Sequence, residues 1–201
     1  VEDEKSLFLL QEFRRDQPGD GGGVSYPDFL DWKARSRSFS AMAIVGADES
    51  TLIANDTPWR ARGALVSADL FKTLGVEPAL GRAFRTDEEL GPAAEGFHPL
   101  MLTYSAWKSR FNGDPGIIGR EVVVDERTLQ VIGVTPAGLF PLEAEPIDYW
   151  VTVASNGLPT ARGTANASRG YRAYAGVLAR LAPGVTPAQA RAELDAINLA
   201  I

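Results

Sequence analysis

The sequence predicts an α+β fold, in which strand-forming runs and short capped helices follow one another along the chain. Residues 41–54 and 59–66 have the pattern of two strands joined by the polar turn "NDTP". Ser25 begins a helical pattern with Asp28 three positions later, which is typical of a capped helix start. Strand, turn and helix patterns follow one another again over 171–201. Helices with one apolar face, in a chain that also forms strands, are expected to pack on a sheet.

The composition excludes several classes of function. The 201 residues suffice to bury a core, and 45% of them are hydrophobic. A formal net charge of −6 opposes nucleic-acid binding, which depends on clustered Lys and Arg. The chain has no cysteine, so disulfides, zinc–thiolate sites, iron–sulfur clusters and thiol nucleophiles are excluded. No stretch approaches the roughly 20 apolar residues of a membrane-spanning helix. We expect a soluble chain, and the helical pattern running to its end favours a piece of a longer protein.

The N-terminal part is expected to hold a strand, a loop and a helix. Residues 6–13, "SLFLLQEF", form a short unbroken apolar run, which predicts a buried strand. The loop that follows contains three glycines at 21–23, but no Lys-Ser/Thr comes after them, so the pattern of a phosphate-binding P-loop is absent. In the helix that starts at Ser25, the apolar face includes Tyr26 and Phe29.

The middle of the chain predicts a short helix, a strand and a second helix. Ser67 or Asp69 is expected to cap the helix over 70–74. "PLMLT" at 99–103 is a short strand pattern. "YSAWKSRF" at 104–111 predicts a helix whose aromatic rings share one face: Tyr104, Trp107 and Phe111.

The stretch "DLFKTLGVEPALGRAF" raises the question of whether its glycines bind a phosphate or bend the chain. Gly75 follows the last apolar position of the short helix, where a left-handed residue is most often glycine. Gly81, with Arg82 beside it, turns the chain again. Because no P-loop Lys-Ser/Thr follows either glycine, we expect both to have positive φ and to bind no ligand.

Two further segments predict strands, and the last predicts a helix. "EVVVDERTLQVIGV" at 121–134 has a hairpin pattern, and because Asp125-Glu126 is not the favoured Asn-Gly pair, a turn longer than two residues is expected. "IDYWVTVA" at 147–154 and "YRAYAGVLARL" at 171–181 predict two more strands.

A capped helix is expected at the C-terminal end of the chain. Thr186, Pro187 and Gln189 form a capping box with proline at the first helical position. We expect the missing strand of a βαβ unit to lie beyond the chain. The apolar stripe of this helix comprises Ala190, Leu194, Ile197 and Ile201.

No arrangement of residues predicts a catalytic, cofactor or metal site. The single histidine, His98, lies at a loop-to-strand boundary, and no G-x-S-x-G pattern accompanies it. The acids at 87–89 fall in the first turn of a short helix, where the helix dipole stabilises them. Asp125-Glu126 is another acidic pair, but the alternating acids of a calcium loop do not occur. We therefore assign no catalytic, cofactor-binding or metal-binding residue, and no cofactor.

Tryptophan and tyrosine side chains are numerous enough to line a sugar or peptide groove, since the chain has four Trp and five Tyr. Trp107 lies on a helix stripe and Trp150 in a strand, so both are expected in the core. Trp32 lies off the main face of its helix and Trp59 starts a strand, so these two are expected to be partly exposed and able to contact a partner. Substrate-binding residues stay unassigned.

Five segments resemble one family in order. They are "VSYPDFLDWKARSRSFSAMA", "VSADLFKTLGVEPALGRAF", "LTYSAWKSRFNGDPGIIGREVVVDERTLQVIGVTPAGLFP", "DYWVTV" and "VLARLAPGVTPAQARAEL". Over about 24–197 they resemble the MacB-like periplasmic core domain, the extracytoplasmic region between the first and second membrane helices of MacB-type ABC permeases. Within that family, the chain is most similar to the duplicated orphan permeases, whose substrate is generally unassigned. Asp125-Glu126 departs from the Asn-Gly turn that relatives often carry.

The resemblance implies a two-lobed α+β domain without enzymatic activity. A porter-like βαβ lobe would comprise 1–74 plus 147–201, and a smaller inserted sabre-like α/β lobe would comprise 75–146. The implied partners are membrane helices of the same permease, a cytoplasmic ATP-binding subunit or domain, and in some systems a periplasmic adaptor. The implied location is the periplasmic side of the cell inner membrane, where the domain relays ATP-driven motion to substrate or partner.

Two other classes of function stay open from the residues alone. One is a free-standing extracytoplasmic binding protein for a peptide, lipid or glycan. The other is an acid-base hydrolase, for which His98 and Asp87 would be the residues to test.

Overall fold

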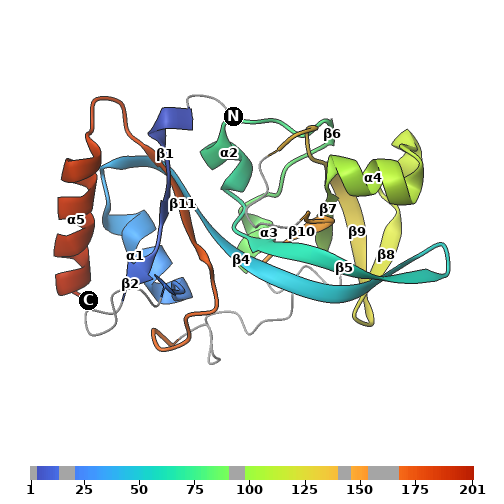
Figure 1. The fold of residues 1–201 in the computed structure, drawn as a ribbon, viewed down its shortest axis with the longest axis horizontal. Helices are drawn as coiled ribbons and strands as arrows, with labels where there is room; N and C mark the ends of the chain where they lie inside the picture. Colours follow the sequence, from blue (N-terminus) through green and yellow to red (C-terminus); the bar gives the residue numbers. More distant parts are fainter. Residues whose placement is uncertain (1–3, 14–20, 91–97, 140–145, 154–167) are drawn as a thin grey trace.

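The computed structural model describes residues 4–13, 21–90, 98–139, 146–153 and 168–201, which form an α+β fold (Figure 1). The helices are α1 (Tyr26–Arg35), α2 (Leu70–Leu74), α3 (Asp87–Leu90), α4 (Tyr104–Phe111) and α5 (Pro187–Leu199), with 3₁₀ turns η1 (Glu4–Ser6) and η3 (Pro115–Ile117). The strands are β1 (Leu7–Leu10), β2 (Glu12–Phe13), β3 (Gly21–Gly22), β4 (Phe39–Ala54), β5 (Thr57–Val66), β6 (Leu80–Gly81), β7 (Pro99–Leu102), β8 (Glu121–Val124), β9 (Arg127–Val134), β10 (Tyr149–Thr152) and β11 (Gly176–Leu181).

Most strands belong to one nine-stranded sheet, in the order β1-β11-β4-β5-β10-β7-β9-β6, with β8 paired to both β4 and β9. The pairs β5–β10 and β7–β9 are parallel. Because β8 connects β9 back to β4, the strands β4, β5, β10, β7, β9 and β8 close on themselves into a barrel. β2 and β3 form a separate two-stranded ribbon.

One long strand, β4, joins the barrel to the rest of the sheet. Its residues 39–45 pair with β11, and its residues 45–54 pair with β5. Near its end, Leu52 and Ile53 pair with β8. In Figure 1, β4 runs from the end of the molecule that carries α1 and α5 to the end that carries α4. The helical end and the barrel therefore share a continuous strand.

Alternate side chains of β4 divide the core into two clusters. Met42 and Ile44 belong to the cluster that includes buried residues of α1 and α5 and continues into the barrel through Leu52. Ala43 and Val45 belong to the second cluster, which includes the apolar residues of α2. The helices α1 and α5 therefore cover one face of this part of the sheet, and α2 covers the other.

Local sequence signals are confirmed at several helix ends and turns. The Ser25 hydroxyl accepts a hydrogen bond from the Asp28 N–H at 3.1 Å, and the Thr186–Gln189 capping box is present. The predicted helix over 104–111 is α4, which ends at Asn112 in the left-handed conformation. The β4–β5 turn has positive φ at Asn55 and Asp56, as a tight hairpin requires.

The turn between β8 and β9 corrects one prediction. It has only two residues, Asp125 (φ 44°) and Glu126 (φ 69°), and not the longer loop expected from their identities. Asp125 is held by β4: its Oδ1 accepts from the Thr51 N–H at 2.8 Å, and its N–H donates to the Thr51 carbonyl at 3.1 Å. These tertiary hydrogen bonds stabilise a backbone conformation that the sequence alone disfavours.

The start of α2 confirms Asp69 as the N-cap residue, but neither the Ser67 nor the Asp69 side chain caps the helix. The Ser67 hydroxyl accepts from the Ile44 N–H at 3.2 Å. Asp69 makes no side-chain cap and pairs instead with Lys33 of α1 at 2.6 Å. Tertiary partners therefore take both side chains away from the helix end.

Two apolar residues expected to be buried are exposed. Residues 7–10 and 12–13 of the predicted run 6–13 form the strands β1 and β2, but Leu9 is 51% exposed. Among the described residues, β1 is an edge strand with β11 as its neighbour. Ile201, the last member of the predicted stripe, is 40% exposed beyond the end of α5, whereas Ala190, Leu194 and Ile197 are buried.

The division into two lobes stays a prediction. Pairing in the barrel joins β4, β5 and β10, which lie within 1–74 and 147–201, to β7, β8 and β9, which lie within 75–146. The strand expected beyond the end of the chain also stays a prediction. The loop predicted after residue 13 falls largely on 14–20, which lies outside the described residues, as do 91–97, 140–145 and 154–167.

Candidate functional site

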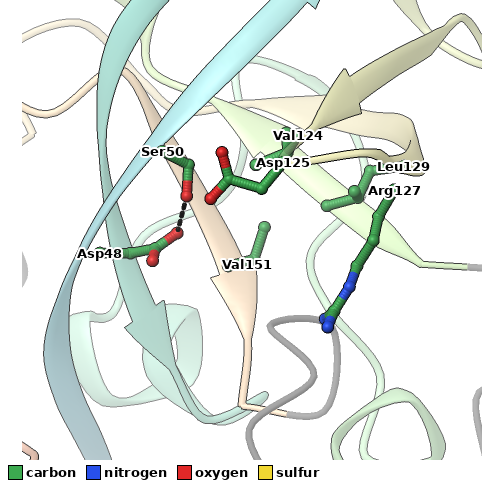
Figure 2. A pocket seen from close by; sticks show the side chains of 7 residues that line it. All are labelled: Asp48, Ser50, Val124, Asp125, Arg127, Leu129 and Val151. Atoms are coloured by element: carbon green, nitrogen blue, oxygen red, sulfur yellow. Dashed lines mark hydrogen bonds between the residues drawn. The ribbon is translucent and has the colours of Figure 1, made fainter.

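A small hollow lies inside the barrel near the β8–β9 turn (Figure 2). Its volume is about 110 Å³, and it is lined by Asp48, Ser50, Val124, Asp125, Arg127, Leu129 and Val151. Figure 2 shows Asp48, Ser50 and Asp125 on one side and Arg127 on the other, with Val151 between them. The hollow thus combines charged groups with apolar walls.

The polar side of this hollow comes from the periodicity of β4. Asp48 and Ser50 fall on the same face as Ile44 and Leu52, so two polar residues interrupt an inward-facing apolar series. Asp48 Oδ2 accepts from the Tyr149 hydroxyl at 2.6 Å and from the Ser50 hydroxyl at 3.4 Å. Burial and then the hydrogen bond to Asp48 raise the pKa of Tyr149 above its ordinary value, so its phenol stays a donor. The Asp48 carboxylate is therefore fixed in place by its neighbours.

The size and contents of the hollow limit its chemistry. Small-molecule pockets usually begin at roughly 300 Å³, well above this volume. The residues that line it include two carboxylates, one hydroxyl and one guanidinium, but no histidine, lysine or thiol that would activate a nucleophile. Within the described residues, no group of three or more metal-ligating side chains is found. The hollow suits a single polar group and carries no catalytic constellation.

A second hollow, of about 210 Å³, lies between α1, α2 and the start of β4. Its charged residues are Lys33, Asp69 and Lys72, of which Lys33 and Asp69 are already paired at 2.6 Å. It too is below the usual volume of a small-molecule pocket.

The two glycines of "DLFKTLGVEPALGRAF" shape the backbone as predicted. Gly75 ends α2 with φ 64°, and Gly81 has φ 74°. A Cβ at Gly81 would lie 2.2 Å from the Ile132 carbonyl oxygen, so this position has no room for a side chain. The guanidinium of Arg82 donates to both carboxylate oxygens of Glu88, at 2.6 and 3.0 Å. The guanidinium of Arg82 is therefore paired with a carboxylate of the same chain and not with a ligand phosphate.

The glycines at 21–23 pack against neighbouring backbone. Gly21 and Gly22 form β3 opposite β2, and a Cβ at Gly23 would lie 2.4 Å from the Arg172 carbonyl oxygen. Close backbone approach therefore explains these glycines without a phosphate.

The acids at 87–89 begin α3 as predicted, but two of them have roles that the sequence did not reveal. Asp87 pairs with Arg85 on the surface, and Glu88 pairs with Arg82. Glu89 is buried, and its carboxylate accepts from the Tyr26 hydroxyl and the Ala68 N–H, both at 3.1 Å. Among the described residues, His98 makes no hydrogen bond to Asp87, and its Nδ1 is buried without a hydrogen-bond partner.

The burial of two tryptophans, Trp32 and Trp107, differs from the prediction. Trp32 was expected to be partly exposed, but it is 2% exposed because α5 packs over it and Asn198 accepts from its Nε1 at 2.6 Å. Trp150 is buried as expected. Trp59 is half-buried as expected, whereas Trp107, expected in the core, is also half-buried.

Three solved structures share this fold: a periplasmic region, a domain of a putative permease and the extracellular domain of a transporter. The periplasmic region of MacB from Actinobacillus actinomycetemcomitans is 14% identical, and the alignment covers 96% of this chain and 81% of that chain with a TM-score of 0.68. A domain of a putative permease protein from Porphyromonas gingivalis is 17% identical, with coverage of 97% and 81% and a TM-score of 0.67. The extracellular domain of the noncanonic ABC-type transporter YknZ from Gram-positive bacteria is 14% identical, with coverage of 93% and 86% and a TM-score of 0.60.

These similarities show that the chain has the fold of the MacB periplasmic region and of the extracellular domain of an ABC-type transporter. The MacB-like periplasmic core domain family matches residues 2–197, so the chain belongs to that family. This match confirms the resemblance carried by its five segments. A comparison with curated proteins finds no match.

Proposed function

We propose that this chain is a non-enzymatic extracytoplasmic domain of a MacB/FtsX-type ABC permease that relays ATP-driven motion to a substrate or a periplasmic partner. Family membership supports the class of protein. The observation that carries the relay is the continuity of β4, which pairs with β11 at the helical end and with β5 and β8 in the barrel.

Contacts between α5 and the start of β4 support a mechanical route through the domain. Both oxygens of the Glu193 carboxylate accept hydrogen bonds from the α1–β4 junction: Oε2 from the Ser36 hydroxyl at 2.7 Å and the Ser38 N–H at 2.9 Å, and Oε1 from the Arg37 N–H at 3.0 Å. Further along α5, the Asn198 side chain accepts a hydrogen bond from Trp32 of α1. A displacement of α5 is therefore transmitted to the first residues of β4.

The proposed partners are membrane helices of the same permease, a cytoplasmic ATP-binding subunit or domain, and a periplasmic adaptor where one exists. None of the helices that the structure describes has the length and hydrophobicity of a membrane span. We place the domain on the periplasmic side of the inner membrane, with 1–74 plus 147–201 as the porter-like lobe and 75–146 as the sabre-like lobe. The transported substrate is left open.

The relay is tested by measuring distances in the assembled permease. Because this chain has no cysteine, spin labels at introduced cysteines are specific within it. Arg191 on α5 and Thr128 on β9 are both exposed and report the helical end and the barrel. Pulsed electron paramagnetic resonance should show that their separation changes on ATP addition and stays constant in an ATPase-inactive permease.

The matched control is a pair of labels within the helical end, at Ala34 on α1 and Arg191 on α5. Both are exposed, and the Glu193 and Asn198 contacts hold these helices together. Their separation should not change with ATP. Constant distances for both pairs during ATP turnover would rule out the relay.

A further inference from the structure

An aromatic surface covered by cations lies on α4 and the adjoining part of β5. Its members are Trp59, Tyr104, Trp107, Lys108 and Arg110, which we call the α4 surface. The three aromatic residues are half-buried, and the two cations are exposed. In Figure 1, α4 lies at the opposite end of the molecule's long axis from α5.

The two cations are fixed by the rings beneath them. Lys108 Nζ lies 4.5 Å from the centre of the Trp107 ring and 5.6 Å from that of Tyr104. The Arg110 guanidinium lies 5.3 Å from the centre of the Trp59 ring. Contacts of this kind hold a cation in place without neutralising it. The α4 surface therefore presents ordered positive charges.

These cations have no carboxylate partner in the described part of the chain. Two neighbouring arginines differ from these cations, because each of them is paired with an acid. Arg120 pairs with Asp114 at 2.5 Å, and Arg60 pairs with Glu49 at 2.7 Å. The positive charge of Lys108 and Arg110 is thus left available to another molecule.

From this surface we infer that α4 docks an acidic segment of a protein partner. Arginine is among the residue types enriched at the centres of protein–protein interfaces, and the unpaired cations favour a partner that supplies carboxylates. A glycan fits less well, because sugars stack on open ring faces, and here Lys108 and Arg110 cover the faces. Between them, Ser105 and Ser109 are short exposed side chains that leave the helix open to approach.

The test uses poly-L-glutamate as the probe and the 201-residue chain. Binding is measured by titration at low salt, with backbone amide NMR shifts to locate it. We expect shifts centred on 104–111 and binding roughly tenfold weaker in the double variant Lys108→Gln, Arg110→Gln, as for the loss of two exposed charge pairs. Thermal unfolding of each variant checks that the fold is kept.

The matched control is the double variant Arg60→Gln, Arg120→Gln, which removes the same charge from cations that are already paired. It should bind poly-L-glutamate within about twofold of the original chain, because Glu49 and Asp114 already offset the charges that are removed. If the two double variants lost the same affinity for poly-L-glutamate, the effect would depend only on net charge, and the inference would be overturned. Heparin binding as tightly as poly-L-glutamate, or no binding of poly-L-glutamate at low salt, would overturn it as well.

Discussion

The hydroxyl of Tyr26 on α1 donates a hydrogen bond of 3.1 Å to Glu89 on α3, although 63 positions separate them in the chain. The other carboxylate oxygen of Glu89 accepts from the Ala68 N–H at 3.1 Å. Glu89 is 2% exposed, so these donors replace water around a buried carboxylate. Burial and then the Glu89 charge raise the pKa of Tyr26 above its ordinary value, which keeps the hydroxyl protonated. One carboxylate therefore ties α1 to α3 and to the start of α2.

Removing the Tyr26 hydroxyl should destabilise the domain. In Tyr26→Phe, the ring still packs on Phe29 and Tyr174, but Glu89 loses a donor in a buried position. We expect the free energy of unfolding, measured in urea, to fall by about 1–3 kcal/mol. Tyr104→Phe is the control, since its hydroxyl makes no hydrogen bond among the described residues, and should change stability by less than about 0.5 kcal/mol. Equal effects of the two substitutions would contradict a structural role for the Tyr26–Glu89 bond.

The Glu193 contact predicts a defined pH dependence. Burial alone would raise the pKa of Glu193, but hydrogen bonds from Ser36, Ser38 and the Arg37 backbone lower it from 4.5 to about 2. A lowered folded-state pKa stabilises the fold above the unfolded value and loses that stabilisation as the pH falls. Glu193→Gln should therefore be less stable than the original chain at pH 7, by roughly 1–2 kcal/mol. The difference should shrink as the pH falls from about 4.5 towards 2.

The control for Glu193 is another acid on the same helix. Asp195 is largely exposed and lies 3.9 Å from Arg191, so Asp195→Asn should change stability by less than about 0.5 kcal/mol. Urea unfolding at several pH values compares the two variants. A pH of about 2.5 lies between the folded and unfolded pKa values of Glu193. If Glu193→Gln differed from the original chain by the same free energy of unfolding there and at pH 7, the Glu193 carboxylate would not cause the pH dependence.

Local elements of the fold were predictable because their signals lie within a few residues. The caps of α1 and α5 and the turn of β4–β5 each depend on side chains close in sequence. Closure of the barrel was not predictable, because β4 pairs with β8 and β5 pairs with β10 across long separations in the sequence. The burial of Trp32 depends in the same way on α5, which lies at the other end of the chain.

The candidate site illustrates the same limit. Asp48 and Ser50 interrupt the inward face of β4, and this alternation was present in the sequence as a usable signal. Their neighbours Asp125, Arg127 and Val151 come from other strands, so only the barrel brings them together. The sequence shows Asp125 as part of an acidic pair, whereas in the structure its side chain anchors the turn on Thr51.

The β8–β9 turn predicts a stabilising substitution. Glu126 has φ 69°, a conformation that costs a non-glycine residue roughly 1 kcal/mol, and its side chain is exposed. Glu126→Gly should therefore raise the free energy of unfolding by about 0.5–1 kcal/mol, with Asp125 still bound to Thr51. Glu126→Ala keeps the strain and serves as the control. An equal gain in both variants would point to the lost charge and not to the backbone.

Gly81 and Gly119 illustrate two different reasons for a glycine: a positive φ, and a lack of space for a side chain. Both have positive φ, 74° and 86°, but a Cβ at Gly81 would lie 2.2 Å from the Ile132 carbonyl oxygen, whereas a Cβ at Gly119 would meet nothing within 4 Å. Gly119→Ala should therefore cost about 1 kcal/mol, the price of the left-handed conformation alone. Gly81→Ala should cost at least about 2 kcal/mol more, because β6 must shift away from β9 to relieve the clash. Urea unfolding of the two variants measures the difference, and similar losses would mean that the backbone at Gly81 moves freely and that the contact with Ile132 does not fix β6.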